Sequence, residues 1–193
     1  VVTESVFPPT SLDPTREMKG KRILIAGNIV NAGDAKKTAG GIWVSAVQDC
    51  QIVNNHVEEY DDVGIDFEGS RNCIADSNTL VNNSRNLAMF GNCKNVTFSN
   101  NTIYMTKDGG PSVGFLNTYS NAYKNITDRR NTDIFVTGNT FNCTAERYDV
   151  FNGSGSIIVG TAKRIVFRNN VFINCMFATH YCDDLESIEI ANN

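Results

Sequence analysis

One asparagine recurs seven times in this chain, and the residues around it recur with it. Seven segments align on it: ILIAGNIV, CQIVNNHV, CIADSNTL, VTFSNNTI, IFVTGNTF, IVFRNNVF and IEIANN. Successive copies lie 27, 23, 23, 38, 31 and 23 residues apart. Self-similarity at such a period is typical of architectures in which each repeat stacks on the next. The aligned residues are Asn28, Asn55, Asn78, Asn101, Asn139, Asn170 and Asn193.

Each repeat has the pattern of a strand that ends in a bend. Apolar residues stand five and three places before the asparagine and two places after it, with more polar residues between the first two, which predicts a half-buried strand. At the bend, left-handed backbone geometry and side-chain-to-backbone hydrogen bonds suit asparagine. We expect the stacked asparagines to hydrogen-bond to one another as a ladder, which explains part of the 25 asparagines in 193 residues.

A second strand-like run follows in most repeats: GIWVSA (41–46), GIDFEG (64–69), LAMFGN (87–92), SIIVG (156–160) and FATHYC (177–182). No stretch of helical period separates the runs, so each coil consists of two or three short strands that pair with the coil below. The pattern predicts an all-β fold, a right-handed single-stranded parallel β-helix of about six coils over residues 22–193. The alternative is a leucine-rich repeat. The chain has only 6 Leu, however, and β-branched residues fill the apolar positions around the repeated asparagine.

The irregular intervals predict loop insertions near 106–132 and 144–155, since insertions leave a solenoid as loops on one face. Residues 1–21 lack the repeat and contain Pro8, Pro9 and Pro14, so we expect a lead-in or cap over the first coil. The strand-like repeat pattern is still in progress at residue 193, so we expect a fragment of a longer chain.

Charge and cysteine spacing exclude several classes of protein. The net charge of −4 argues against nucleic acid as the main ligand, and no stretch approaches the roughly 18 apolar residues of a membrane span. None of the six cysteines forms a CxxC pair. Cys50 and Cys73 share an inward column, and Cys182 falls in another, which favours buried thiols and synthesis in a reducing cytoplasm. Three disulfides are the alternative.

The facing of the second strands follows from their distance to the next repeat. We take the residue six places before the next repeat's first inward residue as inward. This count places Val44, Phe67, Phe90, Val159 and Cys182 inward, together with Ile42, Ile65, Ala88, Ile157 and His180 two places earlier. The residues between them then point outward. In the first three coils these include Trp43 with Ser45, Asp66 with Glu68, and Met89.

The second coil carries an unusual acidic stretch, EEYDDVGIDFE (58–68), with six carboxylates in 11 residues. Asp66 and Glu68 share one strand face, with Cα atoms about 6.5–7 Å apart. Like charges push the pKa values of such a pair apart, which yields one acid and one base. Glycoside hydrolysis needs this combination, and the spacing leaves retention or inversion of configuration open.

Other residues surround the pair as candidate substrate contacts. Trp43 lies one coil away, where an indole ring is a platform for a sugar. Arg85 aligns with Asp62, and Arg71 stacks over Gln48 and beside Lys94.

Structural explanations stand beside the functional ones. One alternative for the acid pair is two solvated charges on an outer sheet, and one for the 58–68 cluster is a Ca²⁺ site of six to eight oxygens. The lead-in could cover Trp43, and Arg85 with Asp62 fits a surface ion pair. We otherwise expect no cofactor and no metal.

The repeat over residues 22–193 resembles the pectin-lyase-like right-handed β-helix superfamily. The stretch DDVGIDFEGSRNCIADSNT (61–79) is most similar to bacteriophage tailspike and appendage depolymerases. Only Asp66 and Glu68 match their paired acids. The polygalacturonase (NTD, DD, GHG, RIK) and alginate-epimerase (DPHE) patterns are absent.

The resemblance implies a glycoside hydrolase that cleaves a bacterial surface polysaccharide, a homotrimer in the full-length protein, and a place in a virion tail made in bacterial cytoplasm. A secreted or cell-surface bacterial protein is the other location. Two alternatives stay open for the activity: a non-catalytic glycan-binding or structural β-helix, and a polysaccharide lyase or epimerase.

Overall fold

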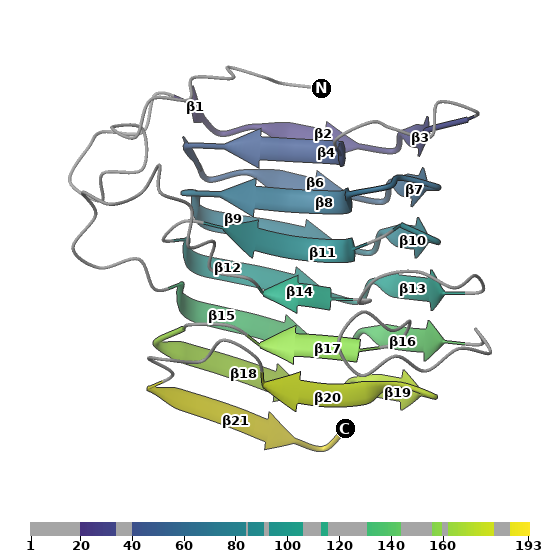
Figure 1. Cartoon of the computed structure of the whole chain (residues 1–193). Coiled ribbons are helices and arrows are strands. Elements are labelled where there is room, and N and C mark those ends of the chain that lie inside the picture. The colour runs from purple at the N-terminus through teal and green to yellow at the C-terminus, as the bar shows by residue number, and fades with distance from the viewer. Residues whose placement is uncertain are drawn as a thin grey trace.

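The chain winds into six coils, and a last strand begins a seventh (Figure 1). The structure is a computed structural model that describes residues 20–33, 40–83, 85–90, 93–105, 113–115, 131–143, 156–159, 162–179 and 186–193, with backbone alone at 90, 113–115, 156–159 and 176–179. Within these residues there are strands and no helix. Every strand pair is parallel, and each strand pairs with the next coil, as the repeat predicts.

Three sheets form the sides of the solenoid, and a coil visits them in the order sheet 1, sheet 2, sheet 3. Sheet 1 contains β1 (Gly20–Lys21), β2 (Leu24–Ala26), β5 (Val47–Gln48), β6 (Gln51–Val53), β9 (Arg71–Asp76), β12 (Lys94–Ser99), β15 (Thr132–Thr137), β18 (Arg164–Arg168) and β21 (Ser187–Ala191). Sheet 2 contains β3 (Ile29–Asn31), β7 (His56–Glu58), β10 (Thr79–Val81), β13 (Thr102–Met105), β16 (Thr140–Cys143) and β19 (Val171–Ile173). Sheet 3 contains β4 (Gly40–Ser45), β8 (Val63–Glu68), β11 (Arg85–Phe90), β14 (Val113–Phe115), β17 (Ser156–Val159) and β20 (Met176–Thr179).

The asparagine ladder is complete from Asn28 to Asn193. In each step the side-chain Nδ2 donates to Oδ1 of the next asparagine, at 2.8–3.0 Å. The same Oδ1 also accepts the backbone N–H of the previous asparagine, for example Asn78 N to Asn101 Oδ1 at 3.0 Å. The five inner asparagines are at most 2% exposed. Every such buried amide is therefore paired, which a stable interior requires.

The left-handed backbone geometry lies one residue earlier than the sequence predicts. The positive φ angles belong to the residues that precede the ladder asparagines, for example Asn54 (54°), Ser77 (56°) and Asn100 (52°). The prediction of left-handed geometry at the ladder position itself is wrong. The bend is made by the preceding residue, and the ladder asparagine uses its amide to reach the neighbouring coils.

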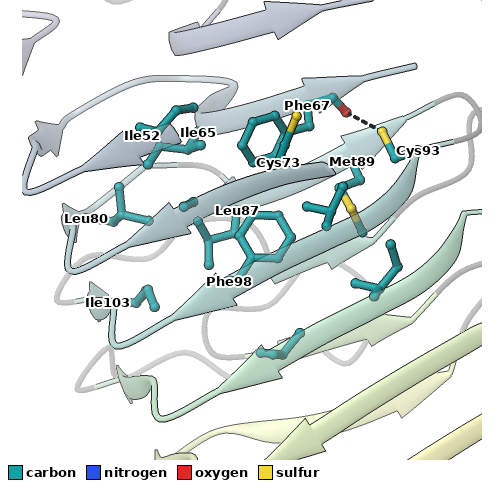
Figure 2. Packing of buried hydrophobic residues seen from close by; sticks show 14 of the residues in the cluster. Ile52, Ile65, Phe67, Cys73, Leu80, Leu87, Met89, Cys93, Phe98 and Ile103 are labelled. Atoms are coloured by element: carbon teal, nitrogen blue, oxygen red, sulfur yellow. Dashed lines mark hydrogen bonds between the residues drawn. The ribbon is translucent and has the colours of Figure 1, made fainter. Parts of the chain in front are cut away.

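The core lies between the three sheets and consists of stacked inward columns (Figure 2). Ile52, Phe98 and Leu80 are 0% exposed, and the rings of Phe67 and Phe98 meet at a centroid distance of 5.8 Å. Cys50 and Cys73 are buried, and the five described cysteines are free thiols, as predicted; Cys182 lies outside the described residues. The Cys93 thiol donates to the backbone oxygen of Phe67 at 3.2 Å.

The register of sheet 3 differs from the prediction in which residues of β11 and β20 face the core. Leu87 pairs with Ile65 and Met89 with Phe67, and both Leu87 and Met89 belong to the core. The predictions that Ala88 points inward and Met89 outward are therefore wrong by one residue, and Phe90 is the register partner of Glu68. In the sixth coil Phe177 and Thr179 align with Ile157 and Val159, in place of the predicted His180 and Cys182, which lie outside the described residues.

The predicted insertions and lead-in lie partly outside the described residues. Within 106–132 the structure contains β14, which pairs with β11 and β17, so three residues of this segment complete sheet 3 in place of a loop. Gly20 and Lys21, assigned to the lead-in, form β1 and pair with β5. Residues 1–19 and 144–155 are not described.

Candidate active site

Strand β8 presents the two predicted carboxylates on its outer face. Alternation along a strand sends Ile65 and Phe67 into the core, where both are 0% exposed. Asp66 and Glu68 therefore point to the other side, as the sequence predicts. In register with them on the coil before are Trp43 and Ser45 of β4. The four side chains form two adjacent rows across one pair of strands, about 4.8 Å apart.

Asp66 is buried, which the prediction of a solvated outer face did not anticipate. Its side chain is 6% exposed, and its Oδ1 atom has no hydrogen-bond partner among the described residues. Burial raises the pKa of Asp66 well above its usual range, and the nearby charges of Glu68 and Asp62 raise it further. Arg85 opposes this shift. Burial of a carboxyl oxygen that has no hydrogen-bond partner favours the neutral, protonated form of the carboxyl.

Glu68 has a more polar environment than Asp66. Its side chain is half-buried, and burial raises its pKa. The neighbouring polar groups of Trp43 and Ser45 favour the ionised form and lower the pKa, while the charge of Asp62 raises it. The sequence predicts a sugar-stacking role for Trp43, but the prediction gave Ser45 no role. The signal for Ser45 was present, since it is the outward residue one coil before Glu68.

The raised pKa values link folding to pH. Between the pKa values of the unfolded and the folded chain, the folded state binds more protons at Asp66 and Glu68 than the unfolded state. The contribution of these two groups to the free energy of unfolding therefore falls as the pH rises through that window. The fold keeps the pair against this cost, as is common for groups that serve a function.

The burial around Asp66 extends to the next coil. Ala88 is in register with Asp66, is 0% exposed and packs with Val63. Trp43, on the other side, is half-buried. The column through Asp66 thus changes from a large aromatic side chain to a small one within three coils.

The predicted ion pair between Arg85 and Asp62 is present. The Arg85 Nη1 atom lies 3.0 Å from the Asp62 carboxylate, and the two side chains are 35% and 50% exposed. An exposed pair of this kind contributes little to stability, about 0–1 kcal/mol. Its importance here is electrostatic, because both charges act on the pKa of Asp66.

Arg71 lies around a corner from the carboxylate pair. It is the first residue of β9 in sheet 1, and it stands in register with Gln48 and Lys94, as predicted. Gly69 and Ser70 make the corner between Glu68 and Arg71, and the Ser70 hydroxyl donates to the backbone oxygen of Glu68 at 2.9 Å. The structure therefore brings together Trp43, Asp62, Asp66, Glu68 and Arg85, with Arg71 at the edge.

The six acids of residues 58–68 are spread over different sides of the coil. Glu58 is on sheet 2, where its carboxylate meets His56 Nε2 at 3.0 Å and Asn31, and the hydrogen bond from His56 lowers its pKa. Across the described ranges, no three His, Cys, Asp or Glu side chains gather as a metal site. The calcium hypothesis remains a prediction from the sequence.

Comparison with known proteins identifies the family. A family model described as a right-handed β-helix region matches residues 18–193. The chain belongs to this right-handed β-helix family. Neither the curated proteins nor the solved structures contain a match. In the described part of this β-helix, no helix is long and apolar enough to cross a membrane. The right-handed β-helix fold is thus established.

Proposed function

We propose that this β-helix protein is a glycoside hydrolase that degrades a bacterial surface polysaccharide. The observation that carries the proposal is the pair Asp66 and Glu68 on one face of β8, with Asp66 buried and Glu68 half-buried. Two carboxylates in unequal environments are what glycosidic hydrolysis requires. The tailspike-like sequence of residues 61–79 supports the choice of a surface glycan, a homotrimeric state and a place in a virion tail.

The unequal environments assign the roles within the pair. Asp66 keeps its proton and acts as the general acid that protonates the leaving oxygen of the glycosidic bond. Glu68, whose ionised form is favoured by the neighbouring polar groups of Trp43 and Ser45, acts as the carboxylate that attacks the sugar or activates water. A sugar reaches the pair from the side of Glu68 and Trp43, which retain partial exposure. The indole of Trp43 stacks on its apolar face.

A second candidate is a non-catalytic β-helix that binds glycan or serves as a structural rod. The observation in its favour is the burial of Asp66 and Ala88 on the same outer face. Burial at this level also suits a carboxyl that is simply packed into the structure. In that case the protein binds a glycan through other surfaces and leaves its length unchanged.

Product analysis separates these functions. We expect incubation of the protein with capsular polysaccharides and lipopolysaccharide O-chains to shorten one of them and to release new reducing ends. Products that absorb in the ultraviolet indicate an unsaturated sugar and would support a lyase. A glycan that is bound and keeps its full length would establish the binding module and contradict the hydrolase.

A further inference from the structure

Large apolar side chains are exposed on two of the three sides of the solenoid. The outer face of sheet 1 carries Leu24, Ile74 and Phe135 in one register column, and Phe135 is 39% exposed. The outer face of sheet 2 carries Tyr104, which is 40% exposed, and Ile173 in one column. Among the described side chains of sheet 3, none is at once large, apolar and exposed. Contiguous exposed apolar side chains mark surfaces of interaction.

The outer face of sheet 1 holds its charges in internal hydrogen bonds. We define the sheet 1 face as two outward columns, that of Ile74 and that of Asp76, two residues further along each strand. The charged residues in these columns are Asp76, Arg168 and Glu189. Arg168 Nε donates to Glu189 Oε1 at 2.7 Å. The Asp76 carboxylate accepts hydrogen bonds from Ser77, Ser99 and Asn100. A partner that covers the sheet 1 face therefore leaves none of these charges unpaired.

The outer face of sheet 2 has the same property. The sheet 2 face consists of the outward columns of Thr102 and Tyr104, and Glu58 is the acid that they contain. Its carboxylate meets His56 Nε2 at 3.0 Å and accepts a hydrogen bond from Asn31. Charges that are buried in an interface must keep their partners, so both faces suit contact with protein. The outer face of sheet 3 differs, because it carries the two carboxylates of the candidate site.

The edge between the two faces is narrow and uncharged. Two residues separate the strands of sheet 1 and sheet 2 at each bend, and the second of them is the inner ladder asparagine. The first has a positive φ angle, and at the six bends it is Gly27, Asn54, Ser77, Asn100, Gly138 and Asn169. Since none of these residues is large or charged, two neighbouring copies can approach the edge closely, one over each face.

The area of the two faces indicates how copies combine. With strands about 4.8 Å apart and a rise of about 3.3 Å per residue, the sheet 1 face measures roughly 29 by 13 Å and the sheet 2 face roughly 24 by 13 Å. Together they offer roughly 700 Å² of flat area, near the value of about 800 Å² that each partner buries in a stable complex. One face alone offers about half of this. A copy that uses both faces at once is therefore favoured over a pair held by one face.

Contact between two different faces closes into a ring of at least three copies. Rotation about an axis parallel to the solenoid keeps every residue at its own height. β13 lies between the levels of β12 and β15 (Figure 1), so Tyr104 and Phe135 differ in height by less than one coil, about 4.8 Å. The large side chains of the two faces thus lie at matching levels on neighbouring copies. A second copy of this chain is the partner that matches both these levels and the spacing of the rows.

We propose that copies of this chain associate side by side with parallel axes, the sheet 1 face of one copy on the sheet 2 face of the next. The candidate site on sheet 3 then stays on the outside of the ring, open to a polymer. Phe135 and Tyr104 are the main apolar contacts between copies. The inference rests on the proposed function for the number of copies, and it names the surfaces that form the homotrimeric state.

Analytical ultracentrifugation of the chain at increasing concentration tests the proposal. We expect the wild type to reach three times the mass of one chain. Phe135→Lys and Tyr104→Asp should each raise the concentration needed for association about tenfold or more, because each places a charge against an apolar surface. Combined in one chain, the two substitutions should restore association to within about fivefold of the wild type, since opposite charges then meet at every contact.

Asn95→Asp is the matched control, because it adds a charge at the opposite corner, between sheets 3 and 1, outside both faces. It should change the concentration needed for association less than about twofold. The melting temperature shows that each variant is folded. We expect it to stay near the wild-type value, because Phe135 and Tyr104 lie on outer faces and are partly exposed.

A wild type that stays monomeric at every concentration, a single variant that associates as well as the wild type, or a double variant no better than the single ones would overturn the proposal. The double variant also tests against packing of two sheet 1 faces, where two lysines would meet. The measurement needs no glycan. A ring in a protein that cleaves no polysaccharide would therefore contradict the hydrolase and leave this inference intact, and a monomer that cleaves would do the reverse.

Discussion

Replacing Glu68 with glutamine is expected to lower the rate of glycan cleavage by about 10²–10⁴-fold, the usual contribution of a positioned acid or base. Glutamine keeps the size of the side chain and its place beside Trp43 and Ser45. It loses the negative charge that attacks the sugar or activates water. The check is the initial rate of reducing-end release at saturating glycan, with the melting temperature measured in parallel.

An exposed acid of the same coil provides the matched control. Asp61 is exposed and precedes β8, so Asp61→Asn changes the charge by the same amount without touching the pair. We expect this variant to cleave within about twofold of the wild-type rate, since distant exposed charges are screened by salt. A folded Glu68→Gln protein that cleaves as fast as Asp61→Asn would remove Glu68 from the mechanism.

Replacing Asn101 with alanine should lower the free energy of unfolding by about 3–5 kcal/mol, because it leaves buried partners unsatisfied on two coils. The Asn101 Oδ1 atom accepts hydrogen bonds from the backbone N–H and the side chain of Asn78, at 3.0 and 2.9 Å. Its Nδ2 donates to the backbone oxygen of Ala75 and to Asn139 Oδ1, both at 2.9 Å. Truncation therefore cuts the ladder at its middle.

Asn95→Gly is the control for this prediction, since Asn95 makes an exposed hydrogen bond to Asn72 and glycine tolerates its positive φ angle of 55°. Water can replace its hydrogen bond, so we expect a loss below about 1 kcal/mol. Thermal unfolding measures both variants, with about 2–4 °C of melting temperature per kcal/mol for a chain of this size. Equal melting temperatures for the two variants would show that the inner ladder is not a main source of stability.

The inner columns of sheet 1 were predictable because their spacing to the ladder never changes. Cys73, Ala75 and Asn78 recur at fixed offsets, and each offset is imposed by packing against the coils on both sides. A strand whose inward residues must meet the same core on every coil leaves a periodic pattern in the sequence. The ladder prediction succeeded for the same reason.

The register of β11 was not predictable by the same counting. Phe67 lies six residues before Cys73, whereas Met89, its register partner, lies seven residues before Val96. One extra residue between sheets 3 and 1 shifts every side chain to the other face. The run from Leu87 to Phe90 contains only apolar residues, so alternation could not reveal the shift.

The candidate site was predictable in part. The shared face of Asp66 and Glu68 follows from strand alternation alone, and the neighbours Trp43 and Ser45 follow from the repeat. The burial of Asp66 depends on what packs over the outer face, which a strand pattern does not record. The sequence predicts one acid and one base in this pair, but that Asp66 is the more buried of the two follows only from the three-dimensional environment.

The central claim is that β8 holds two coupled carboxylates, of which Asp66 keeps its proton. Nuclear magnetic resonance titration of the Asp66 side-chain carboxyl tests it most directly. We predict that Asp66 titrates well above the ordinary aspartate value of about 3.9, and that Glu68→Gln lowers its pKa by removing a nearby negative charge. An Asp66 carboxyl that titrates in the ordinary range, with no response to Glu68→Gln, would contradict the account.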